Sequence, residues 1–96
     1  MHRYQLSRAA MKSMRRIPKN RLKQIFHSLD DLAATEKPTE HHNVTVMKGE
    51  WLGMYRMRIG SYRAIFEVIP DPEIEDETQM LLISVESVGS RGSIYG

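Results

Sequence analysis

The amino-acid sequence predicts an α+β fold in which two helices cover one face of a mostly antiparallel β-sheet. Three segments predict it: an amphipathic stretch from Lys19 to about Ala34, a hairpin pattern from Tyr55 to Val68, and a nearly continuous apolar run from Met80 to Val88. Helices that precede a run of strands are typical of the α+β class. With 96 residues the chain has the length of one small domain, so we expect residues 1–96 to form a single unit.

The first part of the chain is expected to form one strand and a helical hairpin. His2–Leu6 alternates polar and apolar residues, as an opening strand does. Ser7 is a suitable N-cap for the helix that follows, and Pro18 separates that helix from the next. The second helix carries a wide apolar stripe, which predicts packing against the sheet. The stripe consists of Leu22, Ile25, Phe26, Leu29, Leu32 and Ala33.

The segment Thr35–Asn43 is predicted to be a loop because it contains Pro38 and no apolar residue. His41 and His42 are adjacent within it. Neighbouring side chains diverge, and only Glu40 stands beside the pair. A solvated pair of histidines is therefore favoured over a metal site or a proton-transfer pair.

The rest of the chain is expected to add three to four strands. A short strand with Val44 and Val46, and with Met47 as an open alternative, is predicted to end at Lys48-Gly49, before the hairpin. An exposed acidic connection is expected from Pro70 onward. The apolar run that ends at Val88 is predicted to be a central strand. Beyond it, turns are expected at Gly89 and Gly92.

The charges are segregated along the chain, although the net charge is only +2. Residues 1–29 contain eight lysines and arginines and no acidic residue, and acidic residues are concentrated at 71–77. This asymmetry indicates a basic surface for a polyanion with the acidic segment held away from it. A purely solubilising role for the two charged regions is an equal alternative.

The absence of cysteine excludes disulfide bonds and thiolate metal sites, and it is typical of a reducing compartment. No stretch resembles a signal peptide or reaches membrane-spanning length. We therefore expect a cytoplasmic protein without a membrane partner, and we predict no metal and no small-molecule cofactor.

The hairpin pattern collects three arginines on one face of the sheet. With Gly60-Ser61 as a two-residue type II′ turn, the alternation of side chains places Arg56, Arg58 and Arg63 opposite the apolar face. Arg58 then lies across from Arg63, and like charges at such a position repel. Because the fold gains nothing from this pair, an external anion is the simplest reason for it.

Two residues beyond the predicted central strand extend this group. Arg91 and Tyr95 can reach the edge of the same face. Guanidinium groups bind phosphate oxygens in a forked geometry, and a tyrosine ring can stack on a base. One Arg-x-Arg pattern alone indicates an ordinary solvated face, but the convergent set favours a phosphate-binding site.

In these motifs the chain resembles the RelE/ParE superfamily of toxins, which belong to bacterial and archaeal toxin–antitoxin pairs. The resemblance includes the opening strand, the helical hairpin and Met47–Gly49, so it spans almost the whole chain. The residues that match the superfamily's motifs are Arg56, Arg58, Gly60, Tyr62, Arg63, Val88, Gly89, Arg91, Ile94 and Tyr95.

The resemblance implies the activity of the RelE branch, which is the cleavage of messenger RNA in the decoding site of the ribosome. In that reaction a ribose 2′-OH attacks the adjacent phosphate and gives a 2′,3′-cyclic phosphate and a free 5′-OH, without a metal. The implied partners are a cognate antitoxin protein, the ribosome and messenger RNA.

The resemblance also implies roles for individual side chains. Arg63 and Arg91 match arginines that stabilise the transition state. Arg56 and Arg58 stand where relatives have basic residues that grip the backbone and help to activate the 2′-OH, and Tyr95 matches a tyrosine that contacts the substrate near the scissile bond. The residues expected to bind RNA elsewhere are Lys48, Arg15, Arg16, Lys19 and Lys23.

One position departs from the pattern of the RelE branch. Many relatives have a histidine between the glycine and the arginine at the position where this chain has Ser90. Serine cannot replace histidine as an acid or base, and arginine stays protonated. This leaves two alternatives to a nuclease: a gyrase inhibitor like those of the ParE branch, and an inactive relic that only binds its antitoxin.

Overall fold

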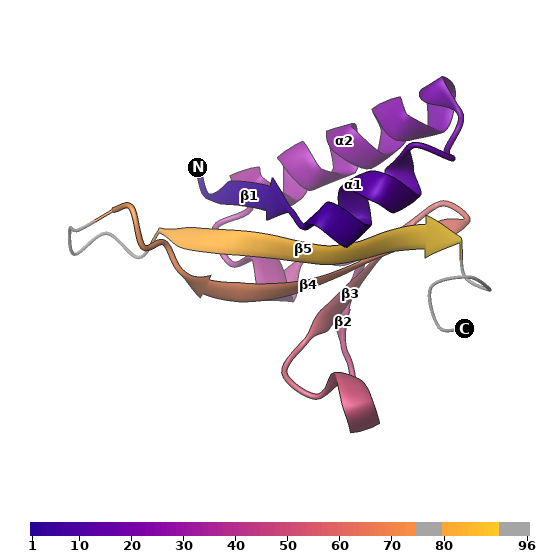
Figure 1. Ribbon diagram of the computed structural model, residues 1–96. Helices are drawn as coiled ribbons and strands as arrows, with labels where there is room; N and C mark the ends of the chain where they lie inside the picture. The colour runs from indigo at the N-terminus through magenta and orange to yellow at the C-terminus, as the bar shows by residue number, and fades with distance from the viewer. Residues whose placement is uncertain (75–79, 91–96) are drawn as a thin grey trace.

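The structure, a computed structural model, describes residues 1–74 and 80–90 of the chain. Two helices lie over one face of a sheet in these residues, and short 3₁₀ turns occur in two connections (Figure 1). The elements in chain order are β1 (Arg3–Leu6), α1 (Arg8–Met14), α2 (Lys19–Ala34), η1 (Pro38–Glu40), β2 (Val44–Val46), η2 (Gly49–Trp51), β3 (Tyr55–Ile59), β4 (Tyr62–Pro70) and β5 (Leu81–Ser90).

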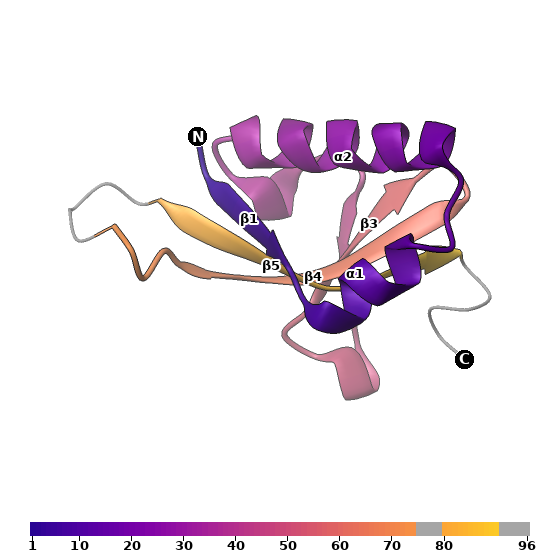
Figure 2. The same ribbon diagram turned by 45° about the horizontal axis from the view of Figure 1, so that its top comes forward.

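The sheet has five strands in the order β1-β5-β4-β3-β2. β1 pairs with β5 in parallel, and the other pairs are antiparallel. The predicted α+β class is therefore confirmed, and the strand count reaches five because the opening strand joins the same sheet. Both α-helices lie on one side of it (Figure 1 and Figure 2), and within residues 1–74 and 80–90 no α-helix covers the opposite face. No helix in the described part of the chain has the length and apolarity to cross a membrane.

Local sequence signals account for the helical hairpin. The hydroxyl oxygen of Ser7 accepts a hydrogen bond from the Ala10 N–H at 3.0 Å, so the predicted N-cap of α1 is confirmed. Pro18 precedes α2, as expected. The predicted stripe of α2 is wrong at Phe26, which is 38% exposed. Phe26 follows the buried Ile25 by one residue, which rotates its side chain by about 100° from the sheet.

The core lies between the helices and the sheet. Each strand of the hairpin contributes alternate residues to it, because successive side chains point to opposite faces. Its buried residues are Ala10, Met14, Ile17, Ile25, Leu29, Leu32, Ala33, Met57, Ile59, Ala64, Phe66, Ile83, Val85 and Val88.

β4 and β5 pair along their whole length with one irregularity. Ile65 pairs with Ser87, but its neighbour Phe66 pairs with Val85. Glu86 is therefore an extra residue on β5, which forms a β-bulge. No residue type in this run signals the bulge in advance.

The predicted central strand is confirmed as β5, and it continues to Ser90. The turn expected at Gly89 is wrong, because Gly89 pairs with Arg63 of β4. Strand pairing uses backbone groups, which glycine has like any other residue. The turn expected at Gly92 lies outside the described residues.

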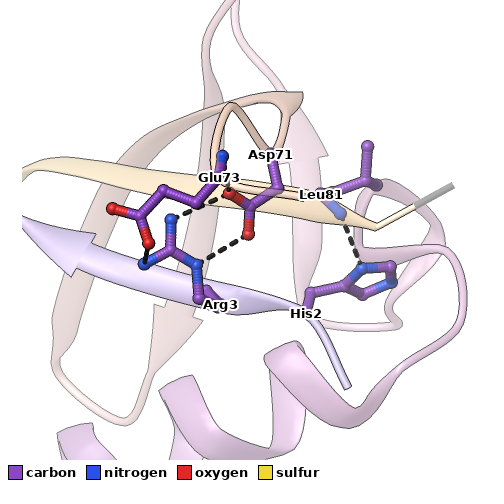
Figure 3. Close-up of polar contacts among 5 residues, drawn as sticks. All are labelled: His2, Arg3, Asp71, Glu73 and Leu81. Atoms are coloured by element: carbon purple, nitrogen blue, oxygen red, sulfur yellow. Dashed lines mark hydrogen bonds and ion pairs between the residues drawn. The ribbon is translucent and has the colours of Figure 1, made fainter. Parts of the chain in front are cut away.

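The acidic connection after β4 is anchored to the N-terminal strand, as Figure 3 shows. The Arg3 guanidinium donates to both carboxylate oxygens of Asp71, at 2.7 and 2.8 Å, and also forms an ion pair with Glu73 at 3.1 Å. The hydrogen bond from Arg3 lowers the pKa of Asp71 to about 2, although burial opposes this shift. The prediction of an exposed connection is therefore wrong at Asp71, which is 4% exposed. The prediction that the acidic segment lies away from the basic N-terminal run is also wrong here, because Arg3 binds Asp71.

His2 also ties the first strand to its neighbours. Its Nδ1 accepts a hydrogen bond from the Leu81 N–H at 3.0 Å (Figure 3), so its Nε2 carries the proton that it donates to the Glu36 carbonyl at 2.9 Å. One imidazole thus joins the start of β5 to the loop after α2. This contact and the Arg3 ion pair hold β1 at the edge of the sheet.

The loop after α2 is packed more tightly than predicted. His41 is 7% exposed, so the expected solvated pair of histidines is wrong for this residue. Its Nδ1 accepts from the Asn43 N–H at 3.0 Å, and its Nε2–H therefore donates to Asp31 at 2.8 Å. This hydrogen bond lowers the pKa of Asp31. His42 is exposed and stacks on His41 with the ring centres 4.4 Å apart.

Candidate functional site

The turn between β3 and β4 has the geometry that the sequence predicts. Gly60 has a φ of 60°. In the described part of the chain only glycines have a positive φ, so the φ of Ser61 is negative. This combination is a type II′ turn, which glycine at the first central position favours. The predicted pairs Ile59–Tyr62, Arg58–Arg63 and Met57–Ala64 are all confirmed.

The three arginines of the hairpin lie on the sheet face opposite the helices. Met57 and Ala64 are in the core between sheet and helices, so the alternating Arg56, Arg58 and Arg63 point the other way. Arg58 is exposed, and Arg56 and Arg63 are half-buried. The predicted face for these residues is thus confirmed by the strand register.

Arg58 and Arg63 form a non-hydrogen-bonded pair of the hairpin. The N–H of Arg58 donates to the Asn43 carbonyl at 2.9 Å, so its backbone groups point away from β4. Side chains of such pairs approach more closely than those of hydrogen-bonded pairs, because their Cα atoms lie about 4.5 Å apart. The register therefore brings two positive charges together at the closest kind of cross-strand position.

The guanidinium of Arg63 is held over the turn. Its Nη1 donates to the carbonyl oxygens of Gly60 at 3.1 Å and of Tyr62 at 2.8 Å. The Nε and Nη2 of Arg63 have no hydrogen-bond partner among the described residues. The guanidinium of Arg58 has no hydrogen-bond partner among them either. One arginine is thus positioned by the turn, with N–H groups left to bind an anion.

The arginines surround an apolar residue on the same face. Ile65 pairs with Arg56 and follows Arg63 by two residues, and it is fully buried although it points away from the helical core. The sequence did not predict burial on this face. Apolar surface beside the arginines reduces the screening of their charges by water, which strengthens their attraction for an anion.

Two carboxylates share this face farther from the hairpin turn, and sequence reasoning missed both. Glu67 follows Ile65 by two residues, so the alternation of β4 was the signal that could have placed it. Ser84 pairs with Glu67, and its hydroxyl donates to the Glu86 carboxylate at 3.1 Å. The face therefore has a basic half near the turn and an acidic half near the bulge.

The basic residues assigned to RNA contact lie in two places. Lys48 is exposed and precedes η2, in the β2–β3 connection, which extends from the sheet on the side away from the helices (Figure 1). The others are exposed on the helical hairpin, on the opposite side of the sheet, so the structure does not bring them to the arginine face. They are Arg15, Arg16, Lys19 and Lys23.

The end of β5 lies beside the hairpin turn. Gly89 pairs with Arg63, and Ser90 pairs with Tyr62. Arg91 and Tyr95, the two other predicted site residues, lie outside the described residues. Ser90, which directly precedes Arg91, lies next to β4, the strand that carries Arg63.

A metal centre is not evident in the described part of the chain, because it contains no group of three or more histidine, aspartate or glutamate side chains that could hold an ion. His41 does contact Asp31, at 2.8 Å. Both ring nitrogens of His41 already have hydrogen-bond partners. On the arginine face, the guanidinium N–H groups of Arg63 and Arg58 are suited to binding an anion.

No protein-family model matches the sequence, and no curated protein matches it significantly. Solved structures do match the fold. A chain of the archaeal RelE–RelB complex from Pyrococcus horikoshii OT3 is 23% identical, with a TM-score of 0.67, over 96% of this chain and 97% of that one. A chain of the RelB–RelE antitoxin–toxin complex from Methanococcus jannaschii is 19% identical, with a TM-score of 0.62, over 94% and 93%.

YafQ from E. coli strain BL21(DE3) matches over the whole length of both chains, with 16% identity and a TM-score of 0.60. These likenesses show that the chain has the fold of the RelE-type toxins. The resemblance predicted from the sequence is thereby confirmed at the level of the fold.

Proposed function

We propose that this chain is the toxin of a toxin–antitoxin pair and that it cleaves messenger RNA on the ribosome, in the cytoplasm. The observation that carries the proposal is the pair of Arg58 and Arg63 on the open sheet face, with Arg63 anchored to the turn. A fold does not need this repulsive pair, and a phosphodiester relieves the repulsion by binding between or beside the two cations.

In the proposed reaction the ribose 2′-oxygen forms a bond to the adjacent phosphorus and loses its proton, while the bond from phosphorus to the 5′-oxygen breaks and that oxygen gains a proton. Negative charge on the phosphate oxygens increases in the transition state. Arg63 stabilises this charge with the N–H groups that the turn leaves available, and Arg91 is its proposed partner.

The neighbouring residues are assigned to substrate binding. Arg56 and Arg58 hold the RNA backbone, Tyr95 contacts the nucleotide at the scissile bond, and Lys48 adds a phosphate contact from the β2–β3 connection. Arginine stays protonated at neutral pH, so it does not act as a general base. Catalysis by this chain therefore depends on charge stabilisation and on the alignment of the 2′-OH with the phosphate, which the ribosome-bound message supplies.

The partner in this proposal is an antitoxin protein. Supporting it, the solved structure from Methanococcus jannaschii is a RelB–RelE antitoxin–toxin complex, and that from Pyrococcus horikoshii OT3 is a RelE–RelB complex. The basic helical surface formed by Arg15, Arg16, Lys19 and Lys23 is available for an acidic partner or for ribosomal RNA.

The test is to map the 5′ ends of messenger RNA in cells that express the chain. Cleavage within translated codons, in phase with the reading frame and abolished by Arg63→Ala, is the expected result. Intact transcripts together with accumulated gyrase cleavage complexes would instead identify a gyrase inhibitor. Intact transcripts with no gyrase effect would identify an inactive relic, the alternative that Ser90 favours.

A further inference from the structure

The arginine face also carries carboxylates, which can do what its arginines cannot. The proposed reaction needs a group that takes the proton of the 2′-OH, and arginine stays protonated. A glutamate carboxylate is ordinarily ionised at neutral pH and can accept a proton. Two glutamates, Glu67 of β4 and Glu86 of β5, lie on this face in the described part of the chain. Their positions relative to Arg63 differ.

The bulge of β5 places Glu86 beside the centre of the arginine face. Two residues of β5, Glu86 and Ser87, lie opposite the single residue Ile65 of β4 at this bulge. Arg63 precedes Ile65 by two residues on the same face, so Glu86 is a diagonal neighbour of Arg63. Diagonal neighbours of an antiparallel pair lie about 7–8 Å apart, within reach of long side chains. One bound phosphodiester can therefore contact both residues.

Hydrogen bonds hold Glu86 in place. Its carbonyl oxygen accepts from the Ser7 hydroxyl at 2.8 Å, and its Oε1 accepts from the Ser84 hydroxyl at 3.1 Å. Ser84 is only 9% exposed, so the group that orients the carboxylate is itself enclosed by the fold. The Oε2 of Glu86 has no hydrogen-bond partner among the described residues. One carboxylate oxygen is thus anchored, and the other is available to a substrate.

Glu86 is also not held in an ion pair. Within residues 1–74 and 80–90, the salt bridges do not include it. The charged side chains that share the face with it are Arg63 and Glu67 of β4 and Arg56 and Arg58 of β3. Glu67 is less suitable as a proton acceptor, because four residues of extended strand separate it from Arg63 by about 13 Å. Glu86 is therefore the carboxylate closer to the proposed phosphate site.

We propose that Glu86 is the general base of the reaction, an inference that rests on the proposed nuclease function. Its Oε2 takes the proton of the ribose 2′-OH while the 2′-oxygen forms its bond to phosphorus. The bond from phosphorus to the 5′-oxygen breaks, and that oxygen takes a proton from water. Arg63 stabilises the charge on the phosphate oxygens, and the proton on Glu86 then passes to the solvent.

The test is single-turnover cleavage of ribosome-bound message by the wild type, Glu86→Gln and the matched control Glu67→Gln. We expect Glu86→Gln to lower the rate by about 10² or more, because general bases commonly contribute this much. Glu67→Gln is expected to cleave at a rate close to that of the wild type. The amide oxygen in Glu86→Gln can still accept the hydrogen bond from Ser84, so its urea midpoint is expected to match the wild type.

Two further measurements distinguish a general base from a residue that only binds RNA or supports the strand. A short RNA with 2′-deoxyribose at the cleavage site cannot react, and it is expected to bind Glu86→Gln at least as tightly as the wild type, because a negative charge near the phosphate is removed. The cleavage rate of the wild type is expected to fall in acid, where a base becomes protonated. The residual rate of Glu86→Gln is expected to lack this fall.

The inference is overturned if Glu86→Gln cleaves at the wild-type rate, if its affinity for the 2′-deoxy RNA drops as much as its rate, or if Glu67→Gln loses as much activity. Cleavage by the wild type and by Glu86→Gln alike rejects the general base and leaves the nuclease in place. A wild-type chain that does not cleave message rejects both.

Discussion

Arg58 of β3 and Arg63 of β4 face each other in a non-hydrogen-bonded pair, and the guanidinium of Arg63 is bonded to carbonyl oxygens at the hairpin turn. The turn therefore orients one of the two cations, while Arg58 stays exposed without a partner among the described residues. Repulsion between these two arginines lowers the stability of the isolated fold. Substitutions at Arg58 and Arg63 can therefore separate an effect on stability from an effect on RNA binding.

Replacing Arg58 with threonine is expected to stabilise the chain and to weaken its binding of RNA. The change removes the like-charge pair and introduces a residue that suits a strand, which we expect to raise the free energy of unfolding by about 0.5 kcal/mol. Urea denaturation measures the first effect, and the affinity for a short RNA at fixed ionic strength measures the second.

Thr45→Arg is a suitable counterpart, because Thr45 pairs with Arg56 and is exposed. We expect this variant to bind RNA at least as tightly as the wild type and to be slightly less stable. If Arg58→Thr instead lowers the stability and leaves RNA affinity unchanged, the pair has a structural role and the arginine face is not the RNA site.

Arg63→Ala is expected to reduce the rate of RNA cleavage by about 10² or more, because it removes a donor aimed at the developing charge. Arg63→Lys is expected to recover little of this activity, since an ammonium group cannot bond to the turn and also present a fork to phosphate. Single-turnover cleavage of ribosome-bound message measures both. A lysine variant with full activity would show that the anchoring of the guanidinium is not needed.

Asp71→Asn is expected to lower the stability at neutral pH and to flatten its dependence on pH in acid. The pKa of Asp71 is about 2 in the folded chain and ordinarily 3.8, so its ionised form is favoured by folding. Its contribution is complete above the ordinary value and is lost as the pH falls through about 2.

Urea midpoints between these two pH values measure the effect of Asp71→Asn. Glu50→Gln serves as the control, because Glu50 is an exposed carboxylate in η2. An Asp71→Asn variant that loses stability on acidification as steeply as the wild type would contradict the role of the Arg3 ion pair.

His41→Ala is expected to destabilise the chain by about 2 kcal/mol or more. The substitution leaves a cavity and deprives the Asn43 N–H and the Asp31 carboxylate of their partner. His42→Ala is the adjacent control, and since His42 is exposed we expect a change within about 0.5 kcal/mol. Equal effects of the two variants in thermal or urea unfolding would show that His41 is not a structural residue.

Local periodicity explains why much of the fold could be predicted. The N-cap at Ser7, the amphipathic pattern of α2 and the II′ turn at Gly60-Ser61 are short-range features, and the alternation of side chains then determines which face each hairpin arginine occupies. These signals lie within one or two turns of helix or one pair of strands, so no long-range contact is needed to interpret them.

Contacts between distant segments could not be predicted in the same way. The ion pair of Arg3 with Asp71 joins residues 68 positions apart, and the hydrogen bond of His41 to Asp31 buries a polar loop residue that composition assigns to the surface. Burial of a polar group depends on whether another segment supplies a partner. No periodic pattern contains that information.

The sequence by itself determined the α+β class, the hairpin register and the shared face of Arg56, Arg58 and Arg63, because all three follow from the geometry of neighbouring residues. Only the tertiary structure decided that Arg3 pairs with Asp71, that His41 is buried against Asp31, and that Glu86 lies beside Ser84 on the arginine face. These contacts join separate segments or depend on the bulge in β5, and neither is written in a local pattern of residues.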